Sequence, residues 1–218
     1  EKKFYGVNNM ISIEEYKQNP CEALSIPYWK ATDIIIPDNI KIIHNKNFDE
    51  TLLEKYSDKQ YFRLIHRLNY VPDFSNNDFT YKMLSKEKTN EIADMINASY
   101  SHTDVFVSAD YIKGLTETKV YFSELWIGAF DNTKLVGSII CDLDTKIGEG
   151  IIEWLQVLPE YREKGIASVL VCKALNILKL NADFATVSGE CDNITNPESV
   201  YRKCGFVGND IWHILTKR

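Results

Sequence analysis

The residues best suited to chemistry lie in the turn 157–168, where Pro159 ends an apolar segment and Gly165 precedes a long apolar stretch. We expect a strand to end at Pro159 and a helix to begin near Gly165. The first amides of a helix lack partners within it, and the helix dipole adds partial positive charge there. Such an end stabilises an anion, and Gly165 and the small Ala167 would let the backbone approach one closely. The turn is either a diphosphate site or a plain tight connection.

The elements that position this turn follow one another regularly after residue 78. Apolar runs bounded by turn residues predict strands at 79–84, 125–130, 135–143, 151–157, 184–188 and 212–216. Helical spacing and capping residues predict helices at 85–100, 108–115, 166–180 and 197–203, the last begun by Asn196. The order predicts a mixed sheet with helices on its faces, an α/β or α+β domain of about 140 residues.

Two motifs in this region resemble those of the GNAT family of N-acetyltransferases. The segment 157–167 reads Val-Leu-Pro-Glu-Tyr-Arg-Glu-Lys-Gly-Ile-Ala, and 201–206 reads Tyr-Arg-Lys-Cys-Gly-Phe. The resemblance covers about residues 78–218. It implies a mixed, mostly antiparallel central sheet flanked by helices. It also implies an acyltransferase that moves an acetyl group from acetyl-CoA, a co-substrate, onto a primary amine in a ternary complex, with no metal.

The resemblance also implies which residues would bind acetyl-CoA. Backbone groups on the strand before the turn would meet the pantetheine arm: Leu155, Gln156 and Val157. Turn amides would hold the diphosphate: Arg162, Glu163, Lys164, Gly165, Ile166, Ala167 and Ser168. An Asn before the later helix would contact the thiol end of the cofactor, and the chain offers Asn193 and Asn196.

Two residues are candidates for catalysis. An alkylammonium with a pKa near 10 is almost wholly charged at pH 7, so its proton must be removed before attack. Glu153 stands four residues before Val157 on one predicted strand, so we expect both on one face and assign Glu153 as the base. The alternative is a carboxylate that only orients the substrate. Tyr201 matches the family position of the acid for the leaving thiolate, and its alternative role is packing.

Other polar and aromatic residues have simpler interpretations. Tyr100, Trp126 and Trp154 either line an acceptor pocket or belong to the core. Asp142 and Asp144 are expected at a solvated hairpin rim. The five cysteines are widely spaced, without Cys-x-x-Cys, which favours free thiols in a reducing cytoplasm.

Composition excludes several classes of protein. The 218 residues are 44% hydrophobic, enough for a core, and carry a net charge of −6 without a basic block. We therefore expect no nucleic-acid partner. No apolar run reaches the length of a membrane helix, so we expect a soluble, cytoplasmic protein with no membrane partner. Dimers are common in similar families, so a homodimer is allowed.

Residues 1–77 form the part that the resemblance does not cover. We predict a strand at 40–44, a short helix at 49–56 capped by Asp49, a strand at 61–68 and a linker at 72–77. We interpret residues 1–77 as an N-terminal extension that packs on the core and shapes a site for a small-molecule amine. Two alternatives stay open: a catalytically silent acyl-CoA-binding module, and an acetyltransferase for protein N-termini or lysines.

Overall fold

The computed structural model describes residues 11–23, 25–74 and 78–218. The end of the expected linker, residues 75–77, and the first ten residues lie outside the described part of the chain. Two compact units are present. The first contains residues 1–66, 186–202 and 206–218, and the second contains residues 67–185 and 203–205.

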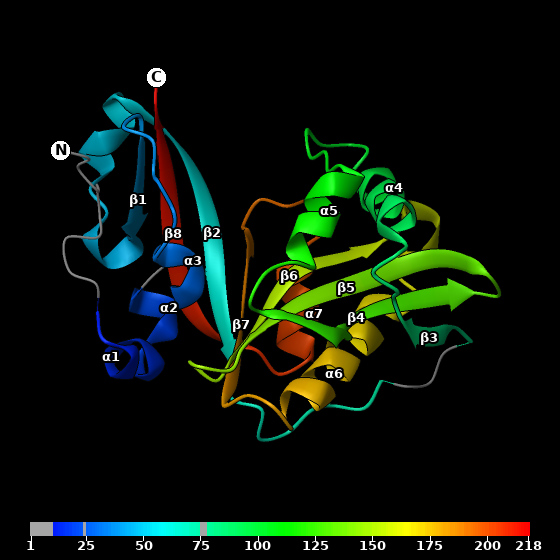
Figure 1. Ribbon diagram of the computed structural model, residues 1–218. Coiled ribbons are helices and arrows are strands. Elements are labelled where there is room, and N and C mark those ends of the chain that lie inside the picture. The colour runs from blue at the N-terminus through cyan, green and yellow to red at the C-terminus, as the bar shows by residue number, and fades with distance from the viewer. Residues whose placement is uncertain (1–10, 24, 75–77) are drawn as a thin grey trace. The chain divides into compact units, whose positions relative to one another are not determined.

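The first unit holds short N-terminal helices and four strands. Its elements are α1 (Ile13–Gln18), α2 (Pro20–Ala23), α3 (Tyr28–Ala31), β1 (Ile40–His44), η1 (Asn45–Asn47), η2 (Glu50–Glu54), β2 (Tyr56–His66), most of β7 (Phe184–Glu190), most of α7 (Pro197–Lys203) and β8 (Val207–Lys217). The strand order in this unit is β1-β8-β2-β7. The antiparallel partners of β8 come from the other end of the chain, since Ile40 pairs with Thr216 and Tyr56 with Lys217 (Figure 1).

The described residues up to His66 therefore share a unit with β8. The boundaries between the units fall after His66, within β7, and on either side of residues 203–205. Asp49 caps a 3-10 helix, because its Oδ1 accepts from the amide of Thr51 at 2.9 Å.

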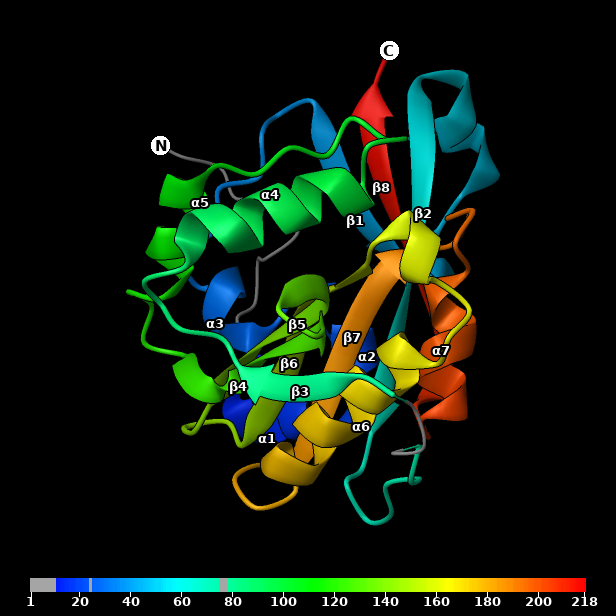
Figure 2. The ribbon, with the colours of Figure 1, turned by 90° about the vertical axis from the view of Figure 1, so that its right-hand side faces the viewer.

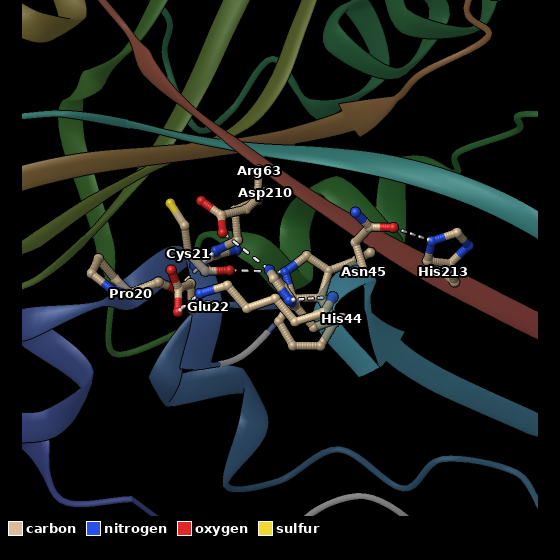
Figure 3. A network of polar contacts seen from close by, with 10 residues as sticks. Pro20, Cys21, Glu22, His44, Asn45, Arg63, Asp210 and His213 are labelled. Carbon is tan, nitrogen blue, oxygen red and sulfur yellow. Dashed lines mark hydrogen bonds and ion pairs between the residues drawn. The ribbon is translucent and has the colours of Figure 1, made fainter. Parts of the chain in front are cut away.

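A buried arginine joins the N-terminal helices to β2. The side chain of Arg63 is only 2% exposed and lies in a polar network (Figure 3). Its Nε and Nη1 donate to the carbonyls of Pro20 and Ser25, both at 3.2 Å, and its Nη2 donates to the hydroxyl of Tyr16 at 3.0 Å. A buried guanidinium must be saturated with acceptors in this way, because an unpaired buried charge is strongly destabilising.

Replacing Arg63 by Met should destabilise the protein by about 3 kcal/mol, because several buried acceptors lose their donor at once. Urea unfolding followed by circular dichroism measures the change. Arg67→Met is the matched control, since Arg67 is exposed, and should stay within about 0.5 kcal/mol of wild type. Equal stability of the two variants would contradict a structural role for the Arg63 network.

The second unit holds the elements that position the candidate site. They are β3 (Thr80–Met83), α4 (Thr89–Ser99), α5 (Ala109–Leu115), β4 (Tyr121–Asp131), β5 (Lys134–Asp144), β6 (Glu149–Val157), η3 (Pro159–Tyr161) and α6 (Ile166–Leu178). Their strand order is β6-β5-β4-β3, with every neighbouring pair antiparallel. Helix α6 lies against one face of this sheet, and α4 and α5 lie on the other (Figure 1 and Figure 2).

Side-chain contacts identify the two faces along β6. A Cβ atom on Gly137, the partner of Val157, would lie 3.1 Å from Ile166 of α6. Val157 therefore points toward α6. Trp154, which pairs with Ile140, points the other way, because its ring meets that of Tyr111 on α5.

Most expected elements are present in this fold. The mixed α/β class with a mostly antiparallel sheet is confirmed, and the helix predicted at 197–203 has those bounds. The helix expected from residue 85 begins only at Thr89. The expectation of a solvated rim at Asp142 and Asp144 is wrong, since they are 2% and 8% exposed. Asp144 tolerates burial because its Oδ1 accepts the turn amides of Lys146 and Ile147 at 3.0 and 3.2 Å.

Hydropathy gives one further constraint on the described residues. None of the helices in 11–23, 25–74 and 78–218 combines the length and the apolar character that a membrane crossing requires.

Candidate active site

The turn between β6 and α6 is built around two residues with positive φ. Glu163 has φ +63° and Gly165 has φ +77°, a left-handed conformation that favours glycine. Gly165 is the N-cap of α6 and provides no side-chain cap. The first bond of the helix runs from the amide of Val169 to the carbonyl of Gly165 at 3.2 Å. The amides of residues 166–168 therefore have no helical carbonyl to which they could donate.

The space in front of this helix end suits an anion. A Cβ atom built on Gly165 would meet nothing within 4 Å. Residues 163–165 are exposed, and the ammonium of Lys164 lies over the ring of Tyr161 at 4.7 Å, so its charge remains beside the turn. Free amides, the positive end of the helix dipole and an open approach together fit a diphosphate.

The backbone amide and the side chain of Arg162 both donate to backbone carbonyls. Its amide donates to the carbonyl of Pro159 at 3.3 Å. Its Nη2 donates to the carbonyl of Ser99 at 2.7 Å, and its Nε donates to that of Val157 at 3.3 Å. The amide of Arg162 is therefore already paired, whereas those of residues 166–168 can donate to an anion.

The edge of β6 away from β5 carries the groups of Leu155 and Val157. The amide of Leu158 donates to the carbonyl of Val136 on β5 at 2.9 Å. Because bonded and non-bonded positions alternate in an antiparallel pair, Gln156 also bonds to β5, while Leu155 and Val157 direct theirs to the outer edge. Gln156 was expected to offer backbone groups to a pantetheine arm. Its backbone faces β5, and its buried side chain donates to the hydroxyl of Ser138.

Glu153 lies at a β-bulge in β6. Ile140 and Cys141 are consecutive on β5, but their partners Trp154 and Ile152 are separated by Glu153. The extra residue interrupts the alternation of side chains. The four-residue spacing alone therefore does not determine whether Glu153 and Val157 share one face, and that expectation stays a prediction. The half-buried Glu153 stays a predicted base.

Glu153→Gln tests that prediction through the pH dependence of turnover. If the carboxylate removes the ammonium proton, kcat/KM for the amine should fall by about 10²-fold near neutral pH. The loss should shrink as pH rises toward the amine pKa near 10, because the neutral amine then needs no base. Glu124→Gln, an exposed carboxylate on β4, is the control. A defect that is constant with pH would indicate orientation of the substrate instead.

Three other predicted site residues belong to the first unit. Tyr201 on α7 is 5% exposed, with its ring near those of Phe62 and Phe206, at 6.2 and 5.7 Å between centroids. The Oδ1 of Asn196 accepts from the amide of Ser199 at 3.3 Å, which confirms it as the cap of α7. The Oδ1 of Asn193 accepts from the amide of Thr195 at 2.9 Å. Both amide oxygens thus shape the loop before α7, and their contact with a cofactor stays a prediction.

An aromatic cluster lies between β6 and the helices α4 and α5. The ring of Trp154 contacts those of Tyr100 and Tyr111 edge-on, with centroids 5.9 and 6.3 Å apart. Trp126 is fully buried and belongs to the core. Tyr111 was not singled out from the sequence as a site residue. Its position three residues after the cap Ser108 was the available signal, since it places the side chain in the first turn of α5.

The thiols of Cys172 and Cys204 interact with each other. All five cysteines are free, and Cys172 and Cys204 are buried and hydrogen-bond to each other. This contact and burial raise the pKa of Cys204, which disfavours a reactive thiolate there. Within residues 11–23, 25–74 and 78–218, no three His, Cys, Asp or Glu side chains gather where they could hold a metal ion.

Part of this chain is similar in sequence to known proteins. Residues 122–208 match the sequence model of the family described as "Acetyltransferase (GNAT) domain". A 94-residue stretch is 33% identical to N-alpha-acetyltransferase 30 of Schizosaccharomyces pombe (strain 972 / ATCC 24843). That stretch covers 39% of this chain and 62% of the yeast protein, so the chain spans less than two thirds of this relative.

Solved structures agree on the fold. The GCN5-related N-acetyltransferase from Sphaerobacter thermophilus has a TM-score of 0.68 at 14% identity, over 87% of this chain and 64% of that one. A chain of the NatC complex bound to Gag peptide and CoA has a TM-score of 0.52 at 21% identity, over 65% of this chain and 99% of that one. At these identities the likeness establishes the fold alone. Residues 122–208 thus resemble an acetyltransferase (GNAT) domain in sequence, and the chain shares the fold of these acetyltransferase structures.

Proposed function

We propose that the protein is an N-acetyltransferase that transfers an acetyl group from acetyl-CoA to a primary amine by direct attack in a ternary complex. The observation that carries this proposal is the start of α6. Its open cradle of amides at residues 166–168, behind the left-handed Gly165, fits a diphosphate. The match of residues 122–208 to an acetyltransferase domain supports the same conclusion.

Acetyl-CoA would supply the activated acetyl thioester, and the chain would supply the remaining groups. The amide of Val157, on the outer edge of β6, would donate to the acetyl carbonyl oxygen as negative charge develops there. Glu153 would accept the ammonium proton of the acceptor, and the phenol of Tyr201 would protonate the departing sulfur. A buried thiol such as Cys172 or Cys204 has no part in this route, because the amine attacks directly.

A small-molecule amine is our first candidate for the acceptor. The half-buried rings of Tyr100 and Trp154 and the more exposed ring of Tyr111 could enclose a compact amine by cation–π contact. Tyr100, which directly follows α4, and Tyr111 on α5 precede residue 122 and so lie outside the matched domain. The acceptor of a relative therefore does not transfer directly to this chain.

A protein N-terminus is the second candidate. It is favoured by the 33% identity to an N-alpha-acetyltransferase and by the likeness to a chain of a complex bound to a peptide. A peptide would need access along the aromatic cluster, where the exposed side chain of Tyr111 would be a contact.

The test is an acetylation assay on the full chain with acetyl-CoA and two panels of acceptors. One panel holds small primary amines. The other holds short peptides with free N-termini, each matched to a peptide blocked at its N-terminus and carrying a lysine. Product mass identifies the acetylated nitrogen. Acetylation of small amines supports the first candidate, and acetylation of free N-termini supports the second. Tight binding of acetyl-CoA without turnover of either panel would favour a silent acyl-CoA-binding module.

A further inference from the structure

The guanidinium of Arg162 connects two elements that are distant in sequence. Its Nη2 donates to the carbonyl of Ser99, the last residue of α4, at 2.7 Å. Its Nε donates to the carbonyl of Val157, the last residue of β6, at 3.3 Å. Arginine suits this task because its donors are fixed in a rigid plane, whereas a lysine ammonium is a single flexible point.

Tyr100 makes a second connection between the same two elements. It directly follows α4, and its hydroxyl donates to the carbonyl of Leu155 on β6 at 3.3 Å. Burial raises the pKa of Tyr100, and the charge of Arg162 lowers it in part. The phenol is therefore protonated at neutral pH and can act as a donor. Tyr100 and Arg162 together occupy the carbonyls of Leu155 and Val157, both on the outer edge of β6.

The charge of Arg162 already has a partner in this arrangement. The last carbonyls of a helix have no amide within the helix to bond, and they form the negative end of the helix dipole. A cation that donates to the carbonyl of Ser99 both pairs a terminal carbonyl and stabilises the negative end of the helix dipole. The positive charge of Arg162 thus stabilises the C-terminal end of α4. In our proposal the diphosphate is bound by the amides of residues 166–168.

We propose that Arg162 is a positioning residue that, with Tyr100, fixes the acceptor-side helix α4 against the outer edge of β6. The amide of Val157, the proposed oxyanion donor, lies on that edge, one peptide unit from the carbonyl that Arg162 holds. Loss of the two hydrogen bonds from the Arg162 guanidinium therefore displaces the end of α4 relative to the reacting groups. The affinity for CoA should remain unchanged.

Hydrogen exchange on the protein without ligands tests the physical connection first. Arg162→Met should increase amide exchange in peptides that cover the end of α4, around residues 96–103, because local opening there becomes easier. Peptides within α6 should exchange as in wild type. Lys179→Met is the matched control, since its Nζ also donates to a backbone carbonyl, that of Asn69 at 3.2 Å. Unchanged exchange at the end of α4 in Arg162→Met would overturn the proposal.

Binding and kinetics then separate positioning from a role of the charge in the diphosphate site. In Arg162→Met, the calorimetric Kd for CoA should change by less than about threefold, while kcat/KM for the amine falls by about 10- to 100-fold through misplacement. Arg162→Lys keeps the charge but cannot make both hydrogen bonds of the planar guanidinium. Its Kd for CoA and its kcat/KM should therefore resemble those of Arg162→Met. Full rescue by lysine, or a tenfold weaker Kd for CoA in Arg162→Met with kcat unchanged, would overturn the proposal.

If Arg162→Met does not fold, Tyr100→Phe tests whether these contacts hold α4 against β6. It removes one donor and retains the ring against Trp154, and it should raise exchange over the same peptides. Because the kinetic arm rests on the proposed function, failure of wild type to acetylate any amine would count against that function. The exchange arm would still decide whether Arg162 and Tyr100 hold α4.

Discussion

Gly165→Glu should weaken binding of CoA by about 100-fold or more. The new carboxylate would stand where the diphosphate is expected, and like charges about 4 Å apart near a surface cost about 1–4 kcal/mol, each 1.4 kcal/mol being tenfold in Kd. A side chain also strains the left-handed backbone, at φ +77°, by about 1–2 kcal/mol. Calorimetric titration with CoA and with acetyl-CoA measures the loss.

Two controls separate the effect of the added charge from the effect of backbone strain. Gly208→Ala strains another positive-φ position, at +121° in the first unit, without adding charge. Gly114→Glu adds a carboxylate on α5 at a site where a Cβ meets nothing within 4 Å. Both should bind CoA as wild type does once folding is verified. Undiminished binding by folded Gly165→Glu would remove the start of α6 as the cofactor site.

Tyr201→Phe should lower kcat by about 10²- to 10³-fold if the phenol protonates the departing thiolate. The substitution keeps the ring, so its packing with Phe62 and Phe206 should persist. KM for acetyl-CoA should stay within about threefold of wild type, because the proton donor acts on the transition state rather than on the bound ground state.

Steady-state kinetics with a saturating amine measures the effect of Tyr201→Phe, and thermal unfolding checks its stability. Tyr70→Phe, at a residue 73% exposed, is the control for loss of a phenol. If Tyr201 only packs under the turn at Gly205, kcat will be unchanged and the acid must be sought elsewhere.

Local patterns predicted the elements of the second unit well. Pro197 at the first helical position after the cap Asn196 predicted α7 correctly, because capping chemistry is encoded in neighbouring residues. The start of α6 near Gly165 was predicted from the long apolar stretch that follows this glycine. In both cases the determining interactions span a few residues.

The features that the sequence could not predict depend on contacts between residues far apart in the chain. The carbonyl of Ser99, which takes up the charge of Arg162, and the bulge at Glu153 depend on partners in other strands and helices. The burial of Arg63 likewise depends on acceptors in the N-terminal helices and turn, more than 35 residues earlier in the chain. No window of neighbouring residues contains these partners, so spacing alone could predict neither the bulge at Glu153 nor the hydrogen bonds of Arg162.

The pairing of β8 with β1 and β2 has a consequence for the order of folding. During synthesis the N-terminal strands leave the ribosome long before Val207–Lys217, the segment that lies between them in the sheet. Until that strand arrives, β1 and β2 each have an edge without their partner, and unpaired strand edges promote aggregation. Closing so large a loop also slows folding. A chain that terminates before residue 207 would therefore lack the strand that pairs with both β1 and β2, and the nascent protein depends on β8 to cover the edges of these earlier strands.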